Sequence, residues 1–333
     1  MKKAVVTLVL GAAVVAAGAA AYKYYEAAVG RKPPKAVTKK VVVPPGYTTA
    51  EIAALLAQEG LIAGARPFVW YCRVHALDGK LQAGDYVLSS EDGIPAIAAA
   101  LAAGRVHVVK FTVPEGYDKK KTARVVKAAG ICSADEFLAA CGRGDRRGRV
   151  PVKDLEGYLF GDTYEVAADA SADDVVAIMV DRFFDVIGPA ELARAEELGR
   201  PLQDVVTLAS IVEREAMLDE ERPLVASVFY NRLARGMRLE SCATVIYALG
   251  GDVDRLTVQD LKVDSPYNTY VYVGLPPGPI CSPGRESLRA ALYPADTAYL
   301  FFVSNGDGSH TFSETFGGHL AARAEKNKRR GKR

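Results

Sequence analysis

The fold class is decided by two similar stretches, VPPGYTTAEIAALLAQEGLI (43–62) and VPEGYDKKKTARVVKAAGI (113–131). Each begins with a strand-like segment and a Pro/Gly turn, continues with apolar residues at helical spacing, and stops at a glycine-bounded end. Two copies indicate a duplicated strand–helix unit, whereas a solenoid needs at least three repeats. The sequence therefore predicts an α+β fold.

The rest of the chain is expected to add further strands and helices. A strand is expected at 84–88, and helices at 94–104, 173–187, 191–198, 204–216 and 223–235. Near the C-terminus, the turn Asn305-Gly306-Asp307-Gly308 predicts a hairpin between strands 299–303 and 310–313. Residues 321–333 are rich in Lys and Arg, and we expect them to form a basic disordered tail.

The N-terminus carries the uncharged, mostly apolar run AVVTLVLGAAVVAAGAAAY (4–22). As a helix rising ~1.5 Å per residue, this run crosses a hydrocarbon core of about 30 Å. A cleaved signal peptide is the alternative, with Ala19-Ala20-Ala21 as its cleavage site, but the length of the run favours an uncleaved transmembrane anchor. Basic residues at 23–40 follow it, so charge alone would keep the C-terminal side in the cytoplasm.

Composition excludes several classes of protein. The 333 residues are 50% hydrophobic and 25% charged, enough for a buried core, and 42 basic against 40 acidic residues argue against a nucleic-acid binder. The five cysteines and four histidines show no metal-ligand spacing. Phosphate-binding and nucleophile-elbow motifs are absent from the sequence, so we expect no cofactor, and a carboxylate is the best remaining catalyst.

Two glutamates on the helix predicted at 204–216 are the candidates. At 100° per residue, Glu215 falls on the apolar stripe of Val205, Leu208, Ile211 and Val212. Glu213 points roughly 160° away from Glu215 by the same arithmetic. Burial among apolar side chains favours the protonated carboxyl group that a general acid requires. The alternative, a surface glutamate paired with an arginine, is not excluded by the pattern.

Polar residues in the C-terminal half are the binding candidates. Tyr267, Asn268, Thr269 and Tyr270 offer groups that suit a sugar chain, and the glycine-rich loop 274–278 can approach a ligand closely. The alternative is that these aromatic residues belong to the core. Asn231 and Arg232 follow an apolar helical run and are expected to brace it.

From residue 208 onward, the chain resembles the YceG-like family, the endolytic murein transglycosylases (MltG). The resemblance is carried by LASIVEREA (208–216), ASVFYNRLARGMRLES (226–241), ATVIYALG (243–250), SPYNTYVYVGLPPGPICSPG (265–284) and FFVSNGDGSHTFSET (301–315). Upstream, VPEGY (113–117) and LEGYLFGDTYEV (155–166) match family blocks in the same order, and 43–62 is similar to the family's LysM-like module. One departure is Cys242-Ala243, where many members have Asp-Pro.

The resemblance implies a lyase that cuts glycan strands of peptidoglycan internally, between N-acetylmuramic acid and N-acetylglucosamine, and leaves 1,6-anhydro ends. Glu215 matches the family's essential glutamate, with Glu213 in a supporting role. Thr244 and Ser282 lie in family blocks and become weaker candidates for substrate binding. The resemblance also implies an N-terminus in the cytoplasm, a catalytic domain outside the cell membrane, and work beside peptidoglycan synthases. The charge balance given above predicts no nucleic-acid partner.

Together, these interpretations divide the chain into five parts. They are a cytoplasmic N-terminus with a transmembrane helix (1–22), a basic linker (23–40), a small LysM-like module (41–107), a larger mixed α/β catalytic domain (108–320) and the basic tail (321–333). Two other functions remain open, a non-catalytic membrane-anchored glycan-binding protein and a muramidase that uses water.

Overall fold

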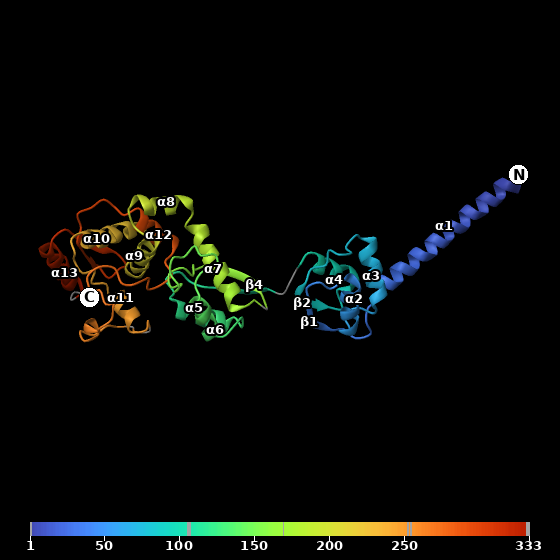
Figure 1. Cartoon of the computed structure of the whole chain (residues 1–333), viewed down its shortest axis with the longest axis horizontal. Coiled ribbons are helices and arrows are strands. Elements are labelled where there is room, and N and C mark those ends of the chain that lie inside the picture. Colours follow the sequence, from blue (N-terminus) through green and yellow to red (C-terminus); the bar gives the residue numbers. More distant parts are fainter. Residues whose placement is uncertain (1, 105–107, 169, 252, 254, 331–333) are drawn as a thin grey trace. The chain divides into compact units, whose positions relative to one another are not determined.

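The computed structural model describes residues 2–330 except 105–107, 169, 252 and 254, and it does not describe the side chains of residues 2–14, 329 and 330. The chain splits into two compact units (Figure 1). The first comprises residues 1–109 with 166–169, and the second comprises residues 110–165 with 170–333. This division falls close to the boundary predicted at 107/108.

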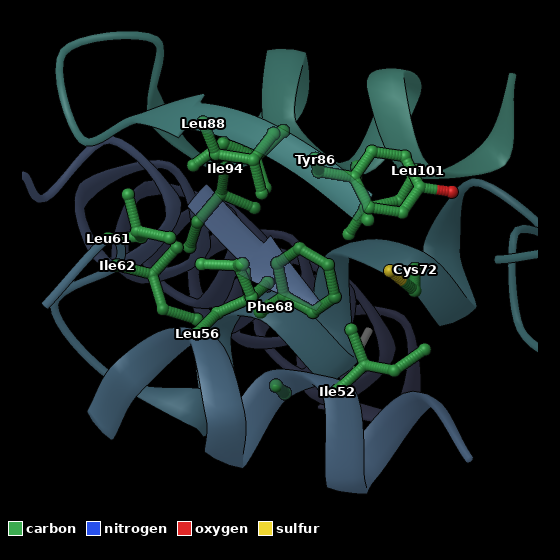
Figure 2. Packing of buried hydrophobic residues seen from close by; sticks show 14 of the residues in the cluster. Ile52, Leu56, Leu61, Ile62, Phe68, Cys72, Tyr86, Leu88, Ile94 and Leu101 are labelled. Carbon is green, nitrogen blue, oxygen red and sulfur yellow. The ribbon is translucent and has the colours of Figure 1, made fainter. Parts of the chain in front are cut away.

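The first unit is a two-stranded antiparallel sheet covered by short helices. Its elements are α1 (Lys2–Val29), β1 (Thr38–Val43), α2 (Thr49–Gln58), α3 (Ala65–Val74), β2 (Gly84–Ser89) and α4 (Gly93–Ala102). Val41 of β1 lies opposite Tyr86 of β2, and Val43 lies opposite Gly84. Apolar residues from the helices and both strands meet in one core, in which Figure 2 shows Phe68 of α3 close to the middle.

Both predicted strand–turn–helix units are confirmed, and local hydrogen bonds explain their bounds. Thr48 caps α2 in a capping box with Glu51, and Asp118 caps α5 (Lys119–Ala128) by accepting from the Lys121 N–H group. Each unit stops at a glycine in the left-handed region, Gly60 with φ of 72° and Gly130 with φ of 75°. A residue with a side chain is strained at such a φ, so glycine ends both helices.

The N-terminal segment differs from expectation in one respect. Helix α1 continues to Val29, and β1 already begins at Thr38, so the linker predicted at 23–40 is shortened to the residues between them. Ala27 and Ala28 are strong helix formers, and the helix stops where Gly30 and a Pro-Pro pair follow. Among the described residues, no helix is both long and apolar enough to span a bilayer. The transmembrane segment predicted at 4–22 lies partly outside the described side chains and stays a prediction.

The second unit is mostly helical, with two small sheets. Its elements are β3 (Val108–Thr112), α5, α6 (Ala134–Cys141), β4 (Thr163–Ala167), α7 (Ala172–Val186), α8 (Pro189–Glu197), α9 (Leu202–Glu215), α10 (Arg222–Ala234), α11 (Cys242–Ala248), α12 (Arg285–Leu292), β5 (Phe301–Ser304), β6 (His310–Ser313) and α13 (Phe316–Arg330). Strand β3 pairs with β4, and the predicted C-terminal hairpin is confirmed as β5 and β6.

Helix α9 lies at the centre of the second unit, in contact with α10, α11 and α12. All residues from Val205 to Val212 are buried, including the polar Thr207 and Ser210. The helix is therefore buried all round and not along one stripe. The two buried hydroxyl groups are satisfied within the helix itself. Thr207 and Ser210 each donate a hydrogen bond to a backbone carbonyl of α9.

The prediction of a disordered tail at 321–333 is wrong for its larger part, because α13 extends to Arg330. This segment is rich in Ala, Lys, Arg and Glu, which favour helix, and charge alone did not reveal that preference. The beginning of α13 packs on the hairpin, where the ring of His319 lies 5.6 Å from that of Phe301.

Candidate active site

The centre of the candidate site is the carboxyl group of Glu215, the last residue of α9. The hydroxyl group of Ser241 donates a hydrogen bond of 2.5 Å to its Oε1. The backbone N–H group of Ala243, in the first turn of α11, also donates to this carboxylate. The end of one helix and the beginning of another therefore meet at Glu215.

Burial and hydrogen bonds act on the pKa of Glu215 in opposite directions. The residue keeps part of its surface accessible to solvent, yet protein atoms surround its carboxyl group. This desolvation is the largest effect and raises the pKa of Glu215, while Ser241, the Ala243 N–H group, His310 and Arg214 lower it. The net shift is upward, so a larger fraction of the carboxyl group is protonated near neutral pH than for an exposed glutamate.

Glu213 is also largely enclosed, with 10% of its side chain exposed, but it has different hydrogen-bond partners. Its Oε2 accepts hydrogen bonds from Arg222 Nη1 at 3.1 Å, from Ser287 Oγ at 2.7 Å and from the Gly284 N–H group at 3.0 Å. These contacts join α9 to α10 and to the start of α12. Glu213 therefore supports the structure. It differs from Glu215 in its hydrogen-bond partners and not in its position on an apolar stripe.

The loop that precedes α11 is held in an unusual conformation. Glu240 has φ of 53°, which is strained for a residue with a side chain. Its N–H group donates to the carbonyl of Thr269, and its carboxylate accepts from Arg232 at 3.1 Å. These contacts fix the backbone immediately before Ser241, and so they fix the hydroxyl group that reaches Glu215.

Four of the predicted substrate-binding residues are buried. Asn268 donates to the carbonyls of Leu261 and Val263, so its amide group shapes its own loop. Thr269 accepts from the Ser241 N–H group at 3.0 Å, and its hydroxyl lies 2.8 Å from that of Thr244. Ser282 is also buried. These four side chains are buried, and Thr244 and Thr269 support Ser241. Direct contact of these four residues with a glycan stays a prediction.

Tyr267 and Tyr270 of the predicted set remain partly exposed. Tyr270 lies beside the carboxyl centre, because its hydroxyl is 3.2 Å from Cys242 Sγ and the charge of Glu215 contributes to raising its pKa, after burial and Cys242. Tyr267 packs its ring 4.9 Å from that of Tyr247 on α11. Direct contact of these two residues with a glycan stays a prediction.

The expected bracing residues do connect distant segments. The amide of Asn231 donates to the carbonyls of Thr297 and Tyr299. Arg232 donates to the carbonyl of Leu300 at 2.7 Å and to that of Leu239 at 2.9 Å. Through these bonds, α10 holds both the C-terminal hairpin and the loop that leads to Ser241.

The sequence reasoning missed three residues that the structure brings to the site or to helix α11 beside it. Ser241 ends the block ASVFYNRLARGMRLES, and no spacing rule connects it with Glu215. His310 lies 2.7 Å from Glu221 Oε2 through its Nδ1 and acts electrostatically on Glu215. Glu156 accepts from Tyr247 of α11 at 3.1 Å and from the Lys119 N–H group, and burial raises the pKa of Glu156 to about 8. All three act across long sequence separations.

A partly buried carboxyl group with a raised pKa and one hydroxyl partner has the properties that general acid–base chemistry requires. The sequence model of the YceG-like family matches residues 41–325, so the chain belongs to the YceG-like family.

Characterised relatives and a solved structure agree with this assignment. The chain is 31% identical over 296 residues to an endolytic murein transglycosylase of Bacillus subtilis, a match that covers 84% of this chain and 82% of that protein. It is 28% identical to an endolytic murein transglycosylase of Streptococcus pneumoniae, covering 78% of this chain and 53% of that protein. A crystal structure of a YceG-like protein from Listeria monocytogenes superposes with a TM-score of 0.59 at 33% identity, covering 85% and 98% of the two chains.

Proposed function

We propose that this protein is an endolytic lytic transglycosylase that cleaves peptidoglycan glycan strands between N-acetylmuramic acid and N-acetylglucosamine. The observation that carries the proposal is the carboxyl group of Glu215, which is desolvated and bound by Ser241 in a chain of the YceG-like family. The names of its relatives from Bacillus subtilis and Streptococcus pneumoniae give the substrate and the reaction.

The geometry supports a mechanism with a single carboxyl group. Protonated Glu215 gives its proton to the glycosidic oxygen as the bond to the anomeric carbon breaks. Ionised Glu215 then takes the proton of the muramic acid 6-hydroxyl while that oxygen bonds to the anomeric carbon and closes the 1,6-anhydro ring. The nucleophile belongs to the substrate, so its effective concentration is high and no water is consumed.

The partners of Glu215 suit both halves of this cycle. Burial favours the protonated acid of the first step, whereas Ser241 and the Ala243 N–H group stabilise the carboxylate that this step leaves behind. The groups that affect the pKa of Glu215 most strongly are hydrogen-bond donors or basic side chains, and none of them is a carboxylate. A retaining hydrolase would place a second carboxyl group about 5–5.5 Å away as its nucleophile.

The proposal includes the location of the enzyme. The uncharged run at 4–22 lies within α1 and is long enough to anchor the chain in the cell membrane, with the N-terminus in the cytoplasm. The second unit then lies outside, where peptidoglycan is made, and works beside peptidoglycan synthases, while the LysM-like first unit lies next to the membrane. Protease treatment of spheroplasts tests the orientation, since an external second unit is digested and a cytoplasmic one is protected.

The decisive experiment is product analysis after digestion of uncrosslinked nascent glycan by the purified full chain. Anhydro-ended products are lighter by one water, about 18 Da, than the products of a hydrolase. We expect anhydro ends with the unaltered protein and none with Glu215→Gln, which keeps the shape of the side chain but has no titratable proton. Glu220→Gln, on an exposed residue of the following turn, is the matched control and should keep full activity.

Other outcomes identify the alternatives. Products that retain the water would show a muramidase, and the absence of any product together with glycan binding would show a non-catalytic anchor protein. Full activity of Glu215→Gln would contradict the role given to this residue.

A further inference from the structure

One face of α3 in the first unit exposes an unusual set of side chains. The exposed residues of this helix are Arg66, Trp70, Arg73 and Val74. Phe68 and Cys72, on its other face, point into the core (Figure 2). The solvated face of a helix normally mixes acidic, basic and neutral polar residues, whereas this face carries only arginine and apolar groups.

Two arginines of this face have no partner among the residues that the structure describes. Within the described part of the chain, the side chains of Arg66 and Arg73 make no ion pair or hydrogen bond. They flank Trp70 at helical spacings of four and three residues, so all three side chains lie on the same face. Together with Ala50, Ala65 and Val69, they line a shallow hollow. Two unpaired guanidinium groups beside an exposed indole ring favour an external anionic partner.

The α3 face lies beside the end of helix α1, and this position indicates which partner it binds. The ring of Trp70 lies 4.8 Å from that of Tyr25 and 6.5 Å from that of Tyr24, both on α1. These tyrosines follow directly after the apolar run at 4–22. Trp70 therefore lies at the level where the apolar part of α1 ends. Trp and Tyr favour such a level in membrane proteins, because their rings are apolar and carry one polar group each.

We propose that the α3 face, defined by Arg66, Trp70 and Arg73 and extended by Tyr24 of α1, rests on the headgroups of an anionic phospholipid bilayer. Basic residues near an anionic surface strengthen binding by roughly fivefold each. The proposal rests on the membrane anchoring of α1 and adds a second contact, which would fix the orientation of the first unit on the membrane. Continuity with the end of the apolar run favours lipid over a wall polymer as the occupant.

Trp70 is the only tryptophan of the chain, so intrinsic tryptophan fluorescence reports on this face alone. The full chain is reconstituted into phosphatidylcholine vesicles with and without phosphatidylglycerol. We expect phosphatidylglycerol to shift Trp70 emission to shorter wavelength, to reduce its quenching by acrylamide, and to allow quenching by lipids brominated near the headgroup. High salt should reverse these changes, because it screens the arginines.

Two double variants with reversed charges distinguish binding of the α3 face to the membrane from a general effect of the protein's net charge. Arg66→Glu/Arg73→Glu should lose the fluorescence changes. Lys120→Glu/Lys127→Glu, a reversal at the same spacing on two exposed residues of α5 in the second unit, should keep them. Equal responses of the two double variants would overturn the proposal.

Resistance of the protein to alkaline carbonate extraction measures anchoring by α1 independently. An anchored chain whose Trp70 remains equally open to acrylamide in both kinds of vesicle would overturn the α3 contact and leave the anchor intact. A chain that carbonate extracts would overturn the anchor, and the α3 contact with it. A Trp70 response to soluble glycan strands but not to lipid would assign the face to the wall polymer instead.

Discussion

Ser241 Oγ donates a hydrogen bond of 2.5 Å to Glu215 Oε1, although 26 positions of sequence separate the two residues. The bond stabilises the ionised carboxylate, and burial opposes it by favouring the protonated acid. The balance between the two sets the pH range in which Glu215 can both give and take a proton. Four predictions follow from this relationship and from the contacts around it.

Ser241→Ala should shift the alkaline limb of the pH–activity profile, where activity falls as pH rises, to higher pH. Removal of a hydrogen bond to a charged group costs the carboxylate about 1.5 kcal/mol, which corresponds to about one pH unit. The pKa of Glu215 rises, so the acid stays protonated to higher pH. The rate of anhydro-product release as a function of pH measures the shift. Ser241→Thr keeps a hydroxyl group and is the control, and an unshifted limb in Ser241→Ala would show that this bond does not tune Glu215.

Ala243→Pro should shift the same limb in the same direction, because proline has no N–H group to donate to the carboxylate of Glu215. Residue 243 lies in the first turn of α11, where proline is tolerated by a helix, so the fold should survive. Ala243→Ser keeps the N–H group and should retain the original profile. Identical pH profiles for the two variants would refute the backbone contribution.

Glu213→Gln should lower the free energy of unfolding and leave the alkaline limb of the pH–activity profile unchanged. It removes one of the two carboxylates that pair with Arg222, and only the exposed Asp219 remains, at 2.8 Å from its Nε. It also weakens the charge-assisted bonds from Ser287 and the Gly284 N–H group, and the loss of such a bond costs about 1.5–3 kcal/mol. Urea unfolding measures the loss, with Glu220→Gln as the control at an exposed position. A shifted pH limb with unchanged stability would indicate that Glu213 belongs to the acid–base chemistry.

Glu156→Gln should flatten the dependence of stability on pH. Burial raises the pKa of Glu156 to about 8 from a usual value of 4.5. Between these two values the folded chain holds a proton that the unfolded chain has released, so the free energy of unfolding falls as pH rises, by at most about 1.4 kcal/mol per pH unit. The variant lacks this group, and its advantage over the unaltered protein should grow from pH 5 to pH 8. Parallel curves from urea unfolding at several pH values would contradict the buried, protonated state.

The elements that the sequence predicted well are those whose signals are local. The helix around Glu215 and the hairpin at 301–313 were recognised from short-range periodicity and turn residues, which act within a few positions. The tail was misjudged, because a run of basic residues resembles a solvated coil even when helix-forming residues such as Ala321 and Ala322 accompany it. The amphipathic stripe that selected Glu215 is not what distinguishes this residue, since α9 is buried all round.

By itself, the sequence determined the α+β class, the two strand–helix units, the family and the choice of Glu215, because these depend on residue type and short spacing. Only the tertiary structure decided which groups surround that carboxyl group. Ser241 and the Ala243 N–H group reach it, Arg222 is paired with Glu213 instead, and Asn268 and Thr269 face inward. Hydrogen bonds and desolvation act over a few ångströms in space, and segments far apart in the chain come within that range only when the helices pack.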